Sequence, residues 1–300
     1  MSRKNNISVI LITLTWICSG RAQFRFEKEI IPQAVREGVQ FSAIVANEFD
    51  DIYLLEDKFN EVYRLDQAGN VLNRNGGFGW GIGQFDRPSD ICVSGLNIII
   101  ADQNNHRIVR YDRKLNYIAT HDLRSDSRLL IYPISLASGQ INEIFILARE
   151  TAEIMRLFVE RNEQTWFGGI DYGEYALDQP VSLRLNQKGH LAVLQRDGSL
   201  LKYDRFGSPL GKIPSPAGKK SKINAIGLVA IQNDWLVLSD NDPGLQLFTT
   251  QAKAWSQPVF LDYDQSLQYR GATYLDNRFY LLTKDGTILV FSHEQPNPKP

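Results

Sequence analysis

The chain has 300 residues, of which 43% are hydrophobic and 22% charged, a composition typical of a globular protein with a large core. Its formal net charge at pH 7 is -1, so the sequence lacks the clustered basic excess of nucleic-acid-binding domains. Composition and charge therefore exclude nucleic acid from the expected partners.

Residues 1–22 are predicted to be a secretion signal. A positively charged start precedes an apolar stretch at 7–17, and small residues follow at the cleavage-determining positions. We expect cleavage after Ala22, a mature chain that begins at Gln23, and an extracytoplasmic protein, either periplasmic or secreted. The apolar stretch is shorter than the roughly 20 residues that span a bilayer, and no later segment approaches that length, so no membrane span is expected. An uncleaved anchor stays as an alternative.

Only two cysteines occur in the chain, and the first lies inside the predicted signal. Lipid attachment at Cys18 is a minor alternative, because the residues before it differ from a lipoprotein signal. Once the signal is removed, Cys92 has no partner for a disulfide. Cys92 lies in the alternating stretch SDICVS, so we expect it to be a buried small hydrophobe rather than a reactive thiol.

The rest of the chain repeats one unit six times. Short apolar strands begin at Ile52, Ile98, Ile144, Leu191, Leu236 and Phe279, at intervals of 46, 46, 47, 45 and 43 residues. Another strand precedes each of these and one follows it, and turns rich in Gly, Asn and Asp lead toward a fourth. The β-branched and aromatic runs lack the spacing of an amphipathic helix. The sequence therefore predicts an all-β fold, a six-bladed β-propeller of four-stranded blades over residues 23–293, with a flexible Pro-rich tail at 294–300.

The last unit supplies only three strands before the proline-rich end of the chain. We expect the N-terminal segment 23–30, QFRFEKEI, to provide the missing strand by pairing beside residues 287–291. This pairing would close the ring without leaving an exposed strand edge.

One unit carries a more specific pattern. Residues 81–112, GIGQFDRPSDICVSGLNIIIADQNNHRIVRYD, follow the order G-x-G-x-F-x-x-P, an apolar strand, an Asp, then N-x-R-I and an aromatic residue. This unit resembles the NHL repeat, and residues 173–185 resemble the first half of it. In a propeller blade the glycines permit a tight path between blades, whereas a phosphate-binding loop needs a helix start that is absent here.

Enzymatic chemistry receives little support from the sequence. The propeller topology places His106 at the top face, His190 in a bottom turn, His121 after the second blade and His293 in the C-terminal tail, too dispersed for one zinc ion. No Gly-x-Ser-x-Gly nucleophile motif occurs. Aligning the inner strands at intervals near 45 gives a small, mostly neutral channel ring, made of Asp90, Ser135, Ser182, Gly227 and Ala272.

An alternative interpretation is a metal-assisted hydrolase or lactonase of the six-bladed propeller type. A bound Ca²⁺ needs six to eight oxygen ligands, and top-face and channel acids are its candidate ligands. These acids are Glu56, Asp90, Asp240 and Asp242. The main interpretation needs no resident cofactor.

The main interpretation is a noncatalytic recognition or scaffold protein, monomeric, that presents top-face loops to a protein, peptide or glycan partner. Arginine and tryptophan side chains are frequent at binding hot spots, and loops on rigid scaffolds carry function. The candidate binding residues are Trp80, Arg87, Arg149, Arg196 and Lys284. We expect their basic sector, opposed by Glu56 and Asp57, to take an anionic or carboxylate-bearing group.

Overall fold

The computed structural model describes residues 22–33, 37–124, 130–139, 142–161, 163–218, 223–241, 244–263 and 266–294. Apart from Ala22 and Glu294, the predicted signal and the predicted tail lie outside these ranges. Within the described ranges, no helix combines the length and the apolar character that crossing a membrane would require.

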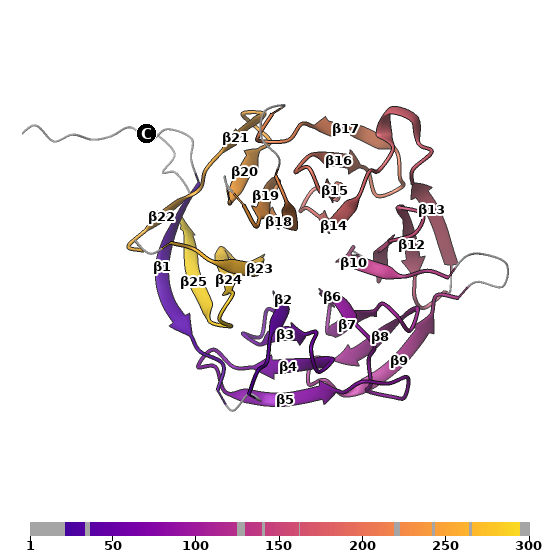
Figure 1. Cartoon of the computed structure of the whole chain (residues 1–300), viewed down its shortest axis with the longest axis vertical. Helices are drawn as coiled ribbons and strands as arrows, with labels where there is room; N and C mark the ends of the chain where they lie inside the picture. Colours follow the sequence, from indigo (N-terminus) through magenta and orange to yellow (C-terminus); the bar gives the residue numbers. More distant parts are fainter. Residues whose placement is uncertain are drawn as a thin grey trace, which may run out of the picture.

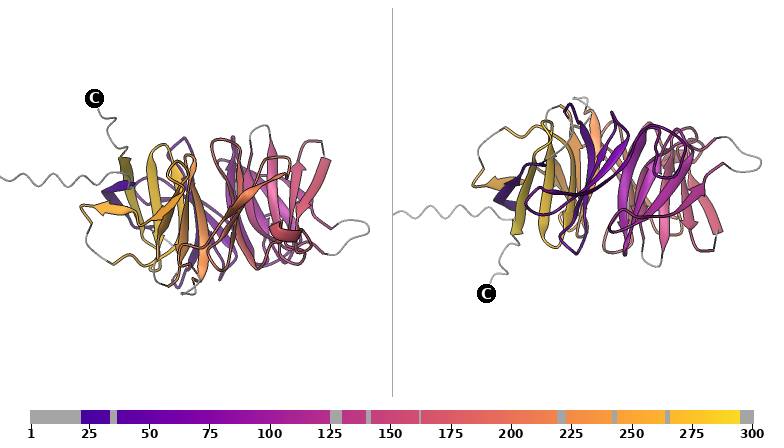
Figure 2. Two further views of the ribbon diagram at one scale, coloured as in Figure 1. Left: turned by 90° about the horizontal axis from the view of Figure 1, so that it is seen from above. Right: turned by 90° about the horizontal axis from the view of Figure 1, so that it is seen from below.

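The described chain forms six sheets arranged as blades around a central channel, which confirms the six-bladed propeller (Figure 1). Five sheets are antiparallel, and the sheet of blade 6 includes one parallel pair. Seen from the side, the blades stand next to one another in a short, wide ring (Figure 2). Blade 1 contains β2 (Phe41–Ala46), β3 (Ile52–Glu56), β4 (Glu61–Leu65) and β5 (Val71–Gly76). Blade 2 contains β6 (Pro88–Ser94), β7 (Asn97–Asp102), β8 (Arg107–Asp112) and β9 (Tyr117–Asp122). Blade 3 contains β10 (Pro133–Ser138), β11 (Glu143–Ala148), β12 (Glu153–Phe158) and β13 (Glu163–Gly168).

Blade 4 contains β14 (Pro180–Leu185), β15 (Leu191–Gln195), β16 (Leu200–Tyr203) and β17 (Pro209–Ile213), preceded by the 3-10 turn η1 (Gly173–Tyr175). Blade 5 contains β18 (Ala225–Ile231), β19 (Asp234–Ser239), β20 (Gln246–Thr249) and β21 (Ala254–Ser256). Blade 6 contains β23 (Tyr269–Leu275), β24 (Arg278–Thr283), β25 (Ile288–Glu294), β1 (Gln23–Ile30) and the short β22 (Val259–Leu261).

The hydrophobic core is divided among the interfaces between neighbouring blades. The described chain contains six buried clusters, one at each interface between neighbouring blades, including the interface between blade 6 and blade 1. The second strand of each blade contributes alternate side chains to the clusters on its two sides. For this reason its sequence is continuously apolar, as in NIIIAD and EIFILA, rather than alternating.

Truncation of Ile99 tests this division of the core. Ile99 lies in β7, is 2% exposed, and packs between blades 2 and 3 in the cluster that also contains the buried free thiol Cys92. We expect Ile99→Ala to lower the free energy of unfolding by about 2–5 kcal/mol, because it removes buried methyl groups and leaves a cavity. Urea denaturation measures the change, and Leu96→Ala at an exposed turn is the control with little expected effect.

The ring closes through the N-terminal strand, as the sequence predicts. β1 pairs antiparallel with β25, from Ile30 opposite Ile288 to Gln23 opposite Glu294. This pairing reaches beyond the expected 287–291 and places His293 in a strand rather than in the tail, which corrects that expectation. Nothing in the sequence indicates β22, which pairs parallel to the other side of β1, so that β1 lies between two strands.

All six inner strands share one irregularity near their first residue. In each pairing of inner and second strand the register skips one residue, which forms a β-bulge. The skipped residues are Ser42, Ser89, Ile134, Val181, Ile226 and Arg270. These bulges surround the end of the channel where the chain enters each inner strand, the end that we call the top face.

Candidate functional site

At the top face the channel widens into a larger cavity, which we call the funnel. The funnel has a volume of about 460 Å³, and its wall includes Arg87, Arg149, Arg196, Asp57, Gln103 and Gln179. The channel cavity below it has a volume of about 90 Å³. Four bulge residues, Ser42, Ser89, Ile134 and Val181, line both cavities, so the two are adjacent.

Equivalent backbone contacts position the funnel arginines. The N–H of Arg149 donates to the carbonyl oxygen of Tyr132 at 3.1 Å, and the N–H of Arg196 donates to that of Gln179 at 3.1 Å. In blade 2 the carbonyl oxygen of Arg87 accepts from the N–H of Gln103 at 3.3 Å. Turns between second and third strands thus lie beside the loops that lead into the inner strands. This arrangement brings Arg87, Arg149 and Arg196 into one cavity, as the repeat topology predicts.

The funnel carries an excess of positive charge. The guanidinium groups of Arg87 and Arg149 have no hydrogen bond or ion pair with any residue that the structure describes. Arg196 Nη1 makes only long contacts, 3.3 Å to the carbonyl oxygen of Ala225 and 3.4 Å to Asn224 Oδ1. Burial, followed by repulsion from the Arg87 guanidinium, lowers the pKa of Arg149. Asp57 is the single carboxylate among the described lining residues, and Glu56, the other acid predicted to oppose the arginines, does not line the funnel.

Gln103 adds a buried polar group to the funnel wall. Its side chain is 1% exposed, and neither its amide oxygen nor its amide nitrogen has a hydrogen-bond partner among the described residues. Leaving such groups unpaired costs free energy, so a buried amide without partners indicates a place where a ligand can supply them. Arg87 and Gln179 also adopt positive φ angles of 58° and 48°, conformations that non-glycine residues rarely take and that are frequent at functional sites.

Trp80 and Lys284 lie on the top face but outside the funnel lining. Trp80 is 76% exposed and forms an apolar ridge with Phe78 and Ile82, which are 69% and 77% exposed. The Arg107 guanidinium fixes the loop that carries the ridge, by donating to the carbonyl oxygens of Trp80 and Gln84, each at 2.8 Å. Lys284 lines a separate cavity of about 290 Å³ between blades 5 and 6, with its Nζ 3.8 Å from Asp240 Oδ1.

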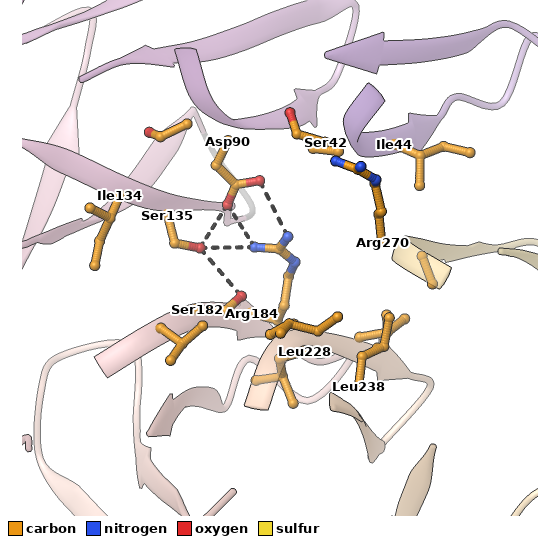
Figure 3. A pocket seen from close by; sticks show the side chains of 18 residues that line it. Ser42, Ile44, Asp90, Ile134, Ser135, Ser182, Arg184, Leu228, Leu238 and Arg270 are labelled. Carbon is orange, nitrogen blue, oxygen red and sulfur yellow. Dashed lines mark hydrogen bonds and ion pairs between the residues drawn. The ribbon is translucent and has the colours of Figure 1, made fainter. Parts of the chain in front are cut away.

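Within the channel, an ion pair joins two blades (Figure 3). Arg184 on β14 reaches Asp90 on β6, with distances of 2.9 Å from Nη1 to Oδ2 and 3.3 Å from Nη2 to Oδ1. Asp90 also accepts from Ser135 Oγ at 2.6 Å and from the N–H of Leu136 at 2.9 Å. These bonds connect blades 2, 3 and 4 at the axis of the ring.

The acids of the alternative metal site do not meet in the described part of the chain. The buried Glu56 carboxylate accepts from the N–H groups of Gln40 and Lys58, and Asp90 pairs with Arg184. Asp240 lies near Lys284, and Asp242 is outside the described residues. Among the residues described, no group of three or more His, Cys, Asp or Glu side chains is arranged to hold a metal ion.

Two details of the channel differ from the sequence alignment. The blade 6 residue equivalent to Gly227 is Gly271, one position before the expected Ala272, because Gly227 faces Leu238 and Gly271 faces Leu282. The alignment also missed Arg184 and the bulge residue Arg270, both of which line the channel. A bulge inserts one residue on one side of a strand pair, so spacing between blades does not reveal which side chain it turns inward.

Comparison with known proteins agrees with the motif and the ring. A family model for the NHL repeat matches residues 85–111. A search among curated proteins found no match. Among solved structures, an inactive variant of virginiamycin B lyase from Staphylococcus aureus with quinupristin is 11% identical, with a TM-score of 0.61, and the match covers 88% of this chain and 99% of that one.

Two further solved structures are similar in fold. The WD40 repeats of RRP9 are 9% identical, with a TM-score of 0.60 and coverage of 87% of this chain and 96% of that one. BamB from Moraxella catarrhalis is 11% identical, with a TM-score of 0.50 and coverage of 83% and 70%. Identities this low establish the fold alone. The observed ring identifies the chain as a six-bladed β-propeller, and residues 85–111 of its second blade match the NHL repeat.

Proposed function

We propose that the protein is an exported, noncatalytic recognition module whose funnel binds a carboxylate-bearing group of a protein or peptide partner. The observation that carries this proposal is the meeting of Arg87, Arg149 and Arg196 in one cavity with a single opposing acid, Asp57. Guanidinium groups form paired, charge-assisted hydrogen bonds with carboxylates. The unpaired Gln103 amide supplies one further donor and one further acceptor.

Two features of the fold support recognition rather than chemistry. The described funnel lining contains no histidine or cysteine and one carboxylate, so it offers no nucleophile and base pair of the usual kind. The ridge of Phe78, Trp80 and Ile82 offers a second contact area on the same face, of a composition frequent at interfaces. A partner anchored in the funnel can extend across the top face toward this ridge.

The proposal is tested with glutarate, a dicarboxylate, and glutaramide, its neutral diamide. We expect the protein to bind glutarate and not glutaramide in calorimetric titrations. Replacing Arg149 and Arg196 together with Ala should weaken glutarate binding by more than about tenfold, because charge-assisted hydrogen bonds are lost. The melting temperature should stay nearly unchanged, since both side chains are exposed.

The matched control replaces two bottom-face arginines, Arg113 and Arg161, with Ala; this variant should bind glutarate as the unaltered protein does. Equal binding of glutarate by the funnel variant and the control would overturn the proposal. Elemental analysis of the purified protein provides an independent check. A stoichiometric divalent cation would instead support the metal-assisted hydrolase.

A further inference from the structure

The channel below the funnel holds a cation without a counter-ion. Among the six bulge residues that surround the channel mouth, only Arg270 is charged; the others are serines and aliphatic residues. Figure 3 shows its guanidinium extending into the channel toward Ser42. It has no hydrogen bond or ion pair with any residue in the described ranges.

The acid that lines the same cavity is already engaged. Asp90 accepts from Arg184, Ser135 and the N–H of Leu136, and its second oxygen accepts from the N–H of Ile91 at 2.9 Å. No other carboxylate lines the channel cavity in the described chain. The two adjacent cavities together are lined by five arginines and two aspartates. An anion that reaches Arg270 therefore has no competing partner.

The shape of the two cavities restricts what can reach this cation. The space narrows from about 460 Å³ in the funnel to about 90 Å³ in the channel. The channel cavity is much smaller than the funnel, so it suits a small group such as a carboxylate better than a bulky side chain. The end of an extended chain brings one strand and a small terminal group into this space, whereas a loop brings two strands.

The funnel wall favours a peptide over a sugar. The flat faces of sugar rings pack on aromatic side chains, and the described funnel lining contains none. It contains instead Pro88, Ile134, Pro180 and Val181, which suit short apolar side chains. The unpaired Gln103 amide can form hydrogen bonds with a peptide group, because each group offers both an N–H donor and a C=O acceptor.

From these observations we infer that the funnel and channel mouth bind the C-terminal end of an extended peptide, with its terminal carboxylate on Arg270. The preceding peptide groups meet Gln103 and the funnel arginines. This inference rests on the proposed function and specifies its ligand as a free chain end rather than an acidic side chain.

The test uses acetyl-trialanine with a free carboxylate, its C-terminal amide, and acetate. Each is titrated into ¹⁵N-labelled protein while the arginine Nε–H resonances are recorded, with the Arg270 resonance assigned through the Arg270→Gln variant. We expect the free acid to shift the Arg270 resonance and to bind about tenfold or more tightly than the amide and than acetate. Arg270→Gln should abolish the preference of acid over amide, and Arg270→Lys should retain part of it. The control Arg161→Gln, on the bottom face, should retain all of it.

The outcomes separate this inference from the proposed function. If acid and amide bind equally, if acetate matches the acid, or if Arg270→Gln keeps the preference, the chain-end inference is wrong. The proposed function then depends only on the glutarate experiment with the Arg149 and Arg196 variant. Absence of any shift up to about 20 mM, above the millimolar Kd that a few such bonds provide, also overturns the inference.

Discussion

Deleting residues 23–32 is expected to remove most or all of the stability of the propeller. β1 supplies Phe24 and Ile30, which are 0% and 2% exposed and belong to the two clusters on either side of blade 6. Loss of one such side chain costs about 2–5 kcal/mol, and domains are stable by only about 5–15 kcal/mol. The deletion also exposes the edges of β25 and β22. Thermal and urea unfolding of the truncated chain measure the effect.

Two control variants separate strand pairing from chain length. Removing residues 295–300, which lie beyond β25, should change the melting temperature little. Arg25→Ala removes exposed ion pairs to Asp262 and Glu294, which contribute little to stability because solvent screens them, while keeping the strand. A truncated chain that lacks 23–32 and still melts cooperatively at the temperature of the full protein would refute the closure as a source of stability.

The second large effect is expected at the axis of the ring. Asp90→Ala leaves the Arg184 guanidinium without its partner and removes the acceptor for Ser135 Oγ and the N–H of Leu136. Breaking a buried ion pair by removing one member costs about 3–5 kcal/mol, because the remaining charge stays poorly solvated. We expect a loss of stability toward the lower end of that range, since the Arg184 side chain is 28% exposed. Urea denaturation measures it.

A double replacement shows how much of the lost stability comes from the unpaired charge of Arg184 and how much comes from lost packing. Asp90→Ala combined with Arg184→Leu should recover part of the stability that Asp90→Ala loses, because no unpaired charge remains. Asp57→Ala, at an exposed position in the funnel, should change stability by no more than about 0.5 kcal/mol. A single Asp90→Ala variant as stable as the unaltered protein would show that this ion pair does not hold the blades together.

The architecture could be predicted from the sequence because each blade repeats the same constraint. The second strand is buried on both faces, so its apolar run recurs at a nearly fixed interval and marks the blades. The missing strand of the last blade also follows from counting strands, since an open ring would expose an edge. β22 could not be predicted, because three residues paired only after closure carry no periodic signal.

The candidate site could be predicted only in part. Arg149 and Arg196 occupy equivalent turns, so repeat spacing places both at the top face. Spacing does not give the distance from the axis, and therefore did not separate Lys284 and Trp80 from the funnel. Gln103 and Arg270 differ from their neighbours by lacking partners among the residues that the structure describes, a property of the folded arrangement that composition and spacing do not contain.

The antiparallel closure has a mechanical consequence. Gln23, at the start of β1, lies opposite Glu294, at the end of β25. A pulling force applied to these two residues loads the backbone pairs one after another, from this end toward Ile30 and Ile288. Strands loaded in this way separate at low force, because their backbone hydrogen bonds break one at a time. Strands pulled along their length must break many hydrogen bonds together. Tension between Gln23 and Glu294 would therefore open blade 6 first.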